Sequence, residues 1–135
     1  MKIILVDDKP HVRNELKLLL EQLPYEYEAV LEAGCDSGAI RLIERHEPDI
    51  IVTDAKLLLS EADALDQVNR QQPHGRIIVT SSHEFVLNAF GKGGMDALLK
   101  PFAKEALEYA LLRAVRAIGQ DCMYGEHQPG AIPAG

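Results

Sequence analysis

Three short runs of apolar, largely β-branched residues constrain this chain more than any other feature of its sequence. They read KIILV at residues 2–6, DIIVT at 49–53 and RIIVT at 76–80. Continuous runs of this length are typical of β-strands covered on both faces, whereas a strand with one solvated face alternates between apolar and polar residues. The three runs therefore predict the centre of a parallel sheet.

Amphipathic segments separate these runs, and two more polar segments, 26–33 and 96–100, are expected to be edge strands. Pro10 suits the first turn of one helix, and Asp36 or Ser37 could cap the next. Strict alternation of strands and helices predicts one α/β domain, a doubly wound five-stranded parallel sheet with five helices. The helical apolar positions are Val12, Leu16, Leu19, Leu20 and Leu23; Ile40 and Ile43; Leu65 and Val68 after a Ser60 cap; Phe85, Val86, Ala89 and Phe90; and Leu107, Ala110, Leu111, Ala114, Val115 and Ile118 before a stop at Gly119.

Polar residues gather where the predicted strands end. Asp7 and Asp8 follow the first strand, and Asp54 follows the third. Thr80 closes the fourth strand and Lys100 closes the fifth. The carboxyl ends of parallel strands meet at one edge of the sheet, where ligands bind in such folds. Because three carboxylates repel each other unless a cation is present, and Mg²⁺ binds carboxylate oxygens, the set predicts a magnesium-dependent site for a phosphoryl group on an oxygen nucleophile.

The segments ILVDD, PDIIVTD, IIVTS and ALLKPF resemble the receiver domain of bacterial two-component response regulators. The resemblance extends from residue 2 to about residue 118 with compatible spacing. It implies a flavodoxin-like fold with strand order 2-1-3-4-5, Asp54 as the phosphoacceptor, and contacts from Thr80 and Lys100 to the phosphoryl group. It also implies a cis Lys100–Pro101 peptide bond. The magnesium ligands that it implies are Asp7, Asp8, Asp54 and the backbone carbonyl of Lys56.

The same resemblance implies a function and partners. Asp54 would accept a phosphoryl group from a phosphohistidine on a sensor histidine kinase, and the labile product would act as a reversible switch for transcription. The chain would then be a signalling module and not an enzyme. A homodimer is expected through the face formed by the fourth helix, the fifth strand and the fifth helix, with Phe90, Lys92, Glu108 and Arg113.

Three departures from the family pattern leave an alternative open. Leu58 and Ala62 stand where the family usually has proline and glycine, so the leucine-rich loop after Asp54 either packs on the domain or forms an apolar patch for a partner. Lys56 occupies a position that tunes the phosphoryl lifetime, and its ammonium could pair with the phosphoryl group or lie in solvent. Ala97 replaces the usual Tyr or Phe, which reports phosphorylation to the output face. The alternative is a pseudo-receiver that dimerises or acts as a scaffold without phosphorylation.

Composition and motifs exclude other classes. The chain has 135 residues and a formal net charge of −7, which disfavours direct nucleic-acid binding because such binding depends on Lys and Arg. No apolar run is long enough to span a membrane and no signal peptide is recognisable, so a cytoplasmic location is expected. Cys35 and Cys122 lack zinc or redox spacing and are predicted to be reduced thiols. Residues 1–119 are predicted to form the receiver domain, and the Gly- and Pro-rich residues 120–135 a flexible tail or linker.

Two other classes fit the sequence less well. An aspartyl-nucleophile phosphohydrolase needs a second aspartate where this chain has Lys56. A flavodoxin needs a phosphate loop rich in hydroxyl groups and glycine after the first strand, and the carboxylates of DDKP at residues 7–10 would repel a flavin phosphate.

Overall fold

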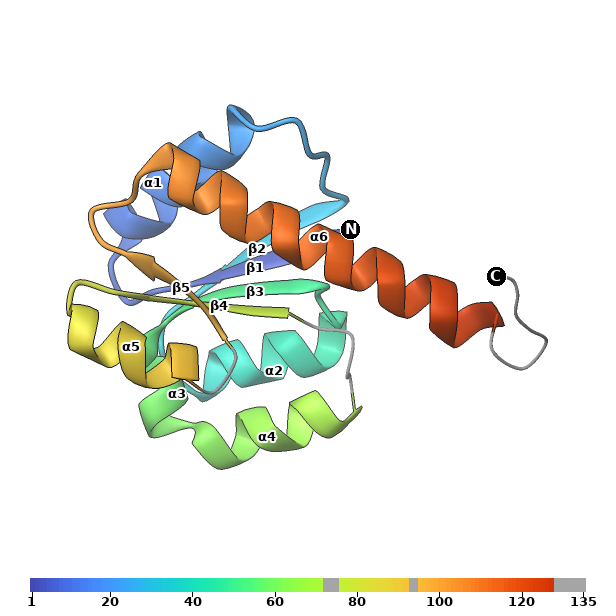
Figure 1. Ribbon diagram of the computed structural model, residues 1–135. Helices are drawn as coiled ribbons and strands as arrows, with labels where there is room; N and C mark the ends of the chain where they lie inside the picture. Colours follow the sequence, from blue (N-terminus) through green and yellow to red (C-terminus); the bar gives the residue numbers. More distant parts are fainter. Residues whose placement is uncertain (72–75, 93–94, 128–135) are drawn as a thin grey trace.

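Five parallel strands form one sheet in the order β2-β1-β3-β4-β5 in the computed structural model of the chain (Figure 1). The structure describes residues 1–71, 76–92 and 95–127, with side chains for all of these except 68–71, 92 and 120–127. Both the parallel α/β architecture and the strand order confirm the predictions. The strands are β1 (Lys2–Val6), β2 (Ala29–Ala33), β3 (Ile50–Asp54), β4 (Arg76–Ser81) and β5 (Asp96–Leu99).

Burial along the strands follows their place in the sheet. Ile3–Val6 of β1 and Ile50–Thr53 of β3 are buried without interruption, because helices cover both faces of these central strands. The edge strand β2 instead alternates between half-buried and exposed residues. Its more polar sequence is therefore a consequence of having one strand neighbour and one partly solvated face.

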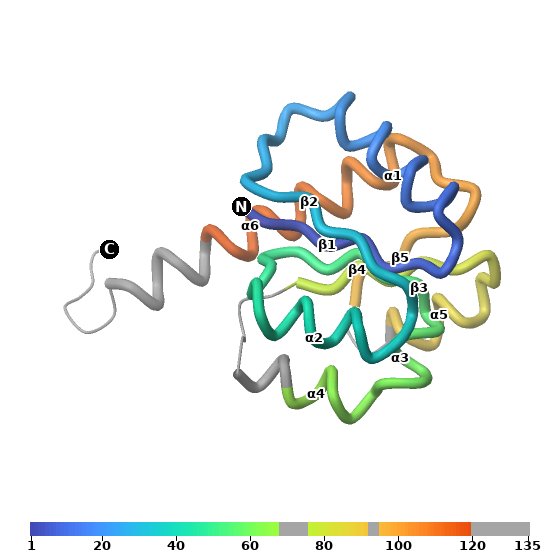
Figure 2. Tube along the Cα trace, turned by 180° about the vertical axis from the view of Figure 1, so that it is seen from behind, coloured from blue at the N-terminus to red at the C-terminus, as the bar shows by residue number. Residues whose placement is uncertain are grey.

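Two helical layers cover the sheet. Figures 1 and 2 show α1 and α6 on one face and α2 to α5 on the other. Two buried clusters correspond to the two layers: Ile3 and Leu5 of β1 pack toward α1 and α6, whereas Ile4 and Val6 pack toward α2, α3 and α4. The helices are α1 (Pro10–Glu21), α2 (Ser37–His46), α3 (Ala55–Ser60), α4 (Ala62–Gln71), α5 (Glu84–Lys92) and α6 (Lys104–His127).

Local signals place the first two helices correctly. Pro10 occupies the first turn of α1, where its missing N–H costs no helical hydrogen bond. Asp36 is the N-cap of α2, and its side chain accepts a hydrogen bond from the Gly38 backbone N–H at 2.8 Å.

Among the helices of the described residues, none combines the length and the apolar character of a membrane span.

Two helix predictions were wrong. The described residues contain six helices where five were expected, because the segment after Asp54 forms the additional short helix α3, and Ser60 ends α3 instead of capping α4. Gly119 does not end the last helix, since α6 continues to His127. A glycine inside a helix costs only about 1 kcal/mol relative to alanine, which the flanking helical residues can offset. The side chains of Val68 and Cys122 lie outside the described set.

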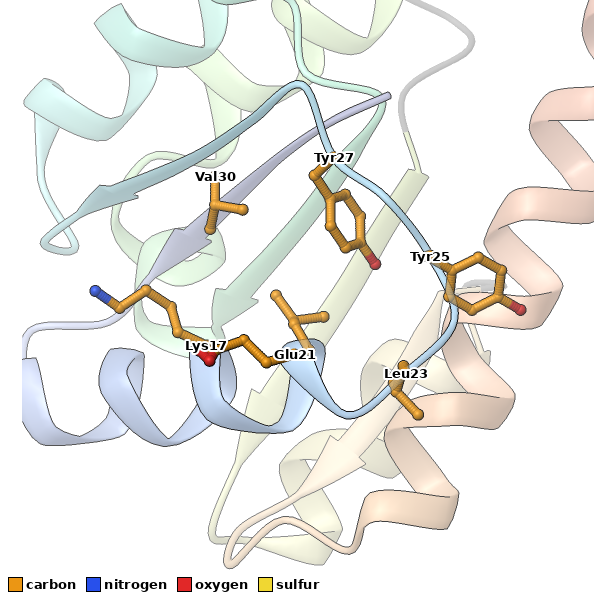
Figure 3. A pocket seen from close by; sticks show the side chains of 7 residues that line it. Lys17, Glu21, Leu23, Tyr25, Tyr27 and Val30 are labelled. Atoms are coloured by element: carbon orange, nitrogen blue, oxygen red, sulfur yellow. The ribbon is translucent and has the colours of Figure 1, made fainter.

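A small cavity lies between α1, the segment that precedes β2, and β2 itself (Figure 3). It measures about 320 Å³ and is lined by Lys17, Leu20, Glu21, Leu23, Tyr25, Tyr27 and Val30. The Tyr27 hydroxyl is buried and has no hydrogen-bond partner among the described residues. Burial, with a smaller contribution from Tyr25, raises the pKa of Tyr27 to about 12.

We predict that Tyr27→Phe leaves the free energy of unfolding at pH 7 unchanged or raises it by about 1 kcal/mol, because it removes an unsatisfied buried hydroxyl. The folded-state pKa of Tyr27 lies above its ordinary value of 10.0, because burial disfavours the phenolate. The unfolded chain therefore ionises first, and the free energy of unfolding of the wild type falls as the pH rises from about 10 to about 12. Urea unfolding across this range should show a steeper loss for the wild type than for Tyr27→Phe. A variant clearly less stable at pH 7 would show that the hydroxyl has a partner.

Candidate functional site

Parallel strand packing brings the predicted polar residues to one edge of the sheet. Asp7 directly follows β1, and Asp54 is the last residue of β3. Asp54 lies opposite Thr80 in the register of β3 and β4, so the buried Thr80 is its neighbour across the sheet. Lys100 follows β5, and its backbone N–H donates to the Ser81 carbonyl oxygen at 2.9 Å, which continues the β4–β5 pairing.

The Lys100 ammonium connects two of the carboxylates. Its Nζ lies 2.6 Å from Oδ2 of Asp7 and 2.7 Å from Oδ1 of Asp54. Burial lowers the pKa of Lys100, but the hydrogen bonds to Asp54 and Asp7 outweigh this effect, and the net change is upward. Lys100 is therefore charged at neutral pH. The Lys100–Pro101 peptide bond is cis, as expected.

Asp8 is bound from two other directions. Its Oδ1 accepts the backbone N–H of Cys35 at 2.7 Å, and its Oδ2 lies 2.7 Å from Nζ of Lys56. The hydrogen bond from Lys56, followed by that from Cys35, lowers the pKa of the half-exposed Asp8 carboxyl. The predicted alternatives for the Lys56 ammonium were the phosphoryl group or solvent, and the structure instead pairs it with Asp8.

Sequence reasoning missed Cys35 as a site residue. Cys35 lies two residues after the end of β2, and the rule that identified the other residues, position at the carboxyl end of a strand, also applies to it. Burial, together with the charges of Asp8, Asp54 and Asp7, raises the pKa of the Cys35 thiol to about 11. The thiol is therefore neutral at pH 7, and its contribution to the site is the backbone N–H.

The segment after Asp54, whose leucines were expected either to pack on the domain or to form an apolar patch, is the short helix α3. The Asp54 carboxylate caps α3, because its Oδ2 accepts the backbone N–H of Lys56 at 2.9 Å. Leu57 and Leu58 are buried in the core, whereas Leu59 is 71% exposed. Two of the three leucines thus pack on the domain, and one projects into solvent.

Ala97 lies beside a hollow on the face formed by α5, β5 and α6. The hollow measures about 430 Å³. Arg113 spans part of it: its Nη1 lies 3.2 Å from Oδ1 of Asp96, and its guanidinium carbon lies 5.7 Å from the Tyr109 ring centroid. Its lining residues are Gly91, Met95, Asp96, Ala97, Ala106, Tyr109, Ala110 and Arg113.

The chemistry of the carboxylates suits a magnesium ion, although lysines hold them in this structure. Carboxylate oxygens of Asp7, Asp8 and Asp54 are the hard donors that Mg²⁺ prefers. Within the described residues, however, no three His, Cys, Asp or Glu side chains are grouped closely enough to hold a metal. The Lys56 and Lys100 ammonium groups lie against these carboxylates instead.

Comparison with known proteins identifies the family. The profile of the response regulator receiver domain matches residues 3–112. The chain belongs to the receiver domain family of response regulators. This confirms the resemblance seen in the sequence and the prediction that the chain is a signalling module and not an enzyme.

Individual relatives agree with this assignment. The sensory transduction protein LytR of Staphylococcus saprophyticus is 31% identical over 122 residues, which cover 89% of this chain and 48% of the relative. The transcriptional regulatory protein BtsR of Salmonella typhimurium is 29% identical over 116 residues, 84% of this chain and 47% of the relative. This receiver domain thus spans about half the length of each. A response regulator receiver domain protein from Clostridium thermocellum superposes with a TM-score of 0.69 at 26% identity, covering 90% of this chain and 97% of that one.

Proposed function

We propose that this receiver domain accepts a phosphoryl group on Asp54 from a sensor histidine kinase and acts as a switch for transcription. The observation that carries the proposal is the Lys100 ammonium, held 2.7 Å from the Asp54 carboxylate at the carboxyl edge of the sheet. A charge fixed there in advance can stabilise the negative charge that develops on an incoming phosphoryl group. The names of the LytR and BtsR relatives, with sensory transduction and transcriptional regulation in them, favour the same role.

The residues of the site suggest how the transfer proceeds. An Asp54 carboxylate oxygen attacks the phosphorus of the phosphohistidine, a P–O bond forms and the P–N bond breaks, and the electron pair leaves with the imidazole nitrogen. In this proposal Lys100, 2.7 Å from Asp54, pairs with a phosphoryl oxygen, and Thr80, opposite Asp54 in the strand register, donates its hydroxyl. Asp7, Asp8, Asp54 and the Lys56 carbonyl are the proposed ligands of Mg²⁺, which when bound would supply further positive charge to the phosphoryl oxygens.

The pseudo-receiver remains the second candidate, favoured by Ala97 and by the helical segment after Asp54. The Lys100 contact with Asp54 favours the phosphorylated module, because an ammonium beside this carboxylate can pair with a phosphoryl oxygen. We further propose that residues 1–119 are the receiver domain, that residues 120–135 connect it to an output region, and that the protein works in the cytoplasm. The acidic charge favours no direct nucleic-acid contact by this domain.

Phosphorylation of Asp54 is the first test. We expect acetyl phosphate to add one phosphoryl group, detected by intact mass, when Mg²⁺ is present and not when a chelator removes it. Asp54→Asn should abolish the gain, whereas Asp63→Asn, which changes an exposed aspartate in α4, should leave it intact. A mass gain that survives Asp54→Asn, or that ignores the chelator, would contradict the proposal.

Self-association through α5, β5 and α6 is the second test. The face carries the exposed residues Glu108 and Arg113 and the half-buried Phe90; the Lys92 side chain lies outside the described set. We expect sedimentation to show a dimer that strengthens with beryllofluoride, a phosphoryl mimic. Ala97→Tyr should alter dimer strength, because it places a ring in the hollow, and should leave Asp54 phosphorylation intact. A monomer in both states at high concentration would remove the dimer proposal.

A further inference from the structure

Lys56 contacts the acidic edge through both its side chain and its backbone. Its ammonium lies 2.7 Å from Oδ2 of Asp8, and its backbone N–H donates to Oδ2 of Asp54 at 2.9 Å. Cys35 already occupies the other oxygen of Asp8 with its N–H at 2.7 Å. Both Asp8 oxygens are thus bound by donors, and residue 56 supplies one of them.

The helical conformation of α3 affects which group of Lys56 faces the site. Backbone N–H groups point toward the N-terminus of a helix and carbonyls toward its C-terminus. Lys56 lies in the first turn of α3, so its N–H faces Asp54 and its carbonyl points along the helix, away from it. For this carbonyl to reach a metal ion beside Asp54, the first turn of α3 would have to open.

The charge of Lys56 also affects the binding of a metal ion at this edge. The three carboxylates and the two ammonium groups that contact them sum to one negative charge, and without Lys56 the sum would be two. An ammonium near an approaching divalent cation repels it, and the effect is appreciable at a few ångströms even near a protein surface. Lys56 therefore opposes metal entry by contact and by charge.

We propose that Lys56 is a tethered counter-cation that competes with Mg²⁺ for Asp8, so that metal binding must first release the ammonium. This inference rests on the proposed function, because it assumes that Asp7, Asp8 and Asp54 form the magnesium pocket. In the metal-free protein, the ammonium compensates part of the repulsion among the three carboxylates. It thereby sets the magnesium concentration at which the site is ready for phosphorylation.

Isothermal titration of the metal-free protein with MgCl₂ tests the proposal without any phosphorylation step. Lys56→Met removes the charge and keeps most of the side-chain length, and we expect Mg²⁺ to bind about three- to tenfold more tightly than in the wild type. Lys56→Arg keeps the charge and should bind Mg²⁺ nearly as the wild type does. Lys17→Met is the matched control, because Lys17 is also paired with a carboxylate, Glu32 at 2.8 Å, and its loss changes the net charge equally.

The outcomes separate this inference from the proposed function. Tighter binding in Lys56→Met, with Lys17→Met unchanged, supports the competition. Equal or weaker binding in Lys56→Met, or the same gain in Lys17→Met, would overturn the competition and leave the magnesium pocket standing. If neither the wild type nor Lys56→Met binds Mg²⁺, the pocket itself fails, and the inference fails with it.

Discussion

The ammonium of Lys100 is the contact on which the functional edge of this domain depends. It bridges Asp7 after β1 and Asp54 at the end of β3, although Lys100 itself follows β5. In the strand order, β4 lies between β5 and β3, and β1 lies one strand further, so the lysine and aspartate side chains must extend toward each other across the intervening strands. The Asp7 side chain is only 5% exposed, and an ionised carboxylate so placed is costly without a cation. The long side chain of lysine therefore meets a need that the sheet topology creates.

Much of this arrangement could be predicted from the sequence, for a physical reason. Strands buried on both faces must be apolar throughout, so KIILV, DIIVT and RIIVT identified the sheet centre. Parallel pairing then places the residues at the carboxyl ends of the strands along one edge, which predicts that Asp7, Asp54 and Lys100 lie together. Their roles in phosphorylation stay predictions, because proximity alone does not show chemistry.

The features that the sequence did not reveal depend on tertiary contacts as well as on weak local preferences. α3 forms because Asp54 caps it, because Ala, Lys and Leu favour a helix, and because Leu57 and Leu58 reach the core. The two local signals were present in the sequence, although the segment was expected to be a loop. Gly119 failed as a helix stop because a single glycine costs too little to end α6. The partner of Lys56 could not be deduced either, since Lys56 lies in α3, beyond the end of β3, and strand register does not determine where its side chain points.

A double-mutant cycle between Asp7 and Lys100 tests the central claim most directly. The free energy of unfolding in urea would be measured at pH 7, without magnesium, for the wild type, Asp7→Asn, Lys100→Met and the double variant. If Lys100 holds the buried Asp7 charge, Lys100→Met should cost about 1–3 kcal/mol more in the wild-type background than in Asp7→Asn. Equal costs in the two backgrounds, within about 0.5 kcal/mol, would show that the edge does not depend on this contact.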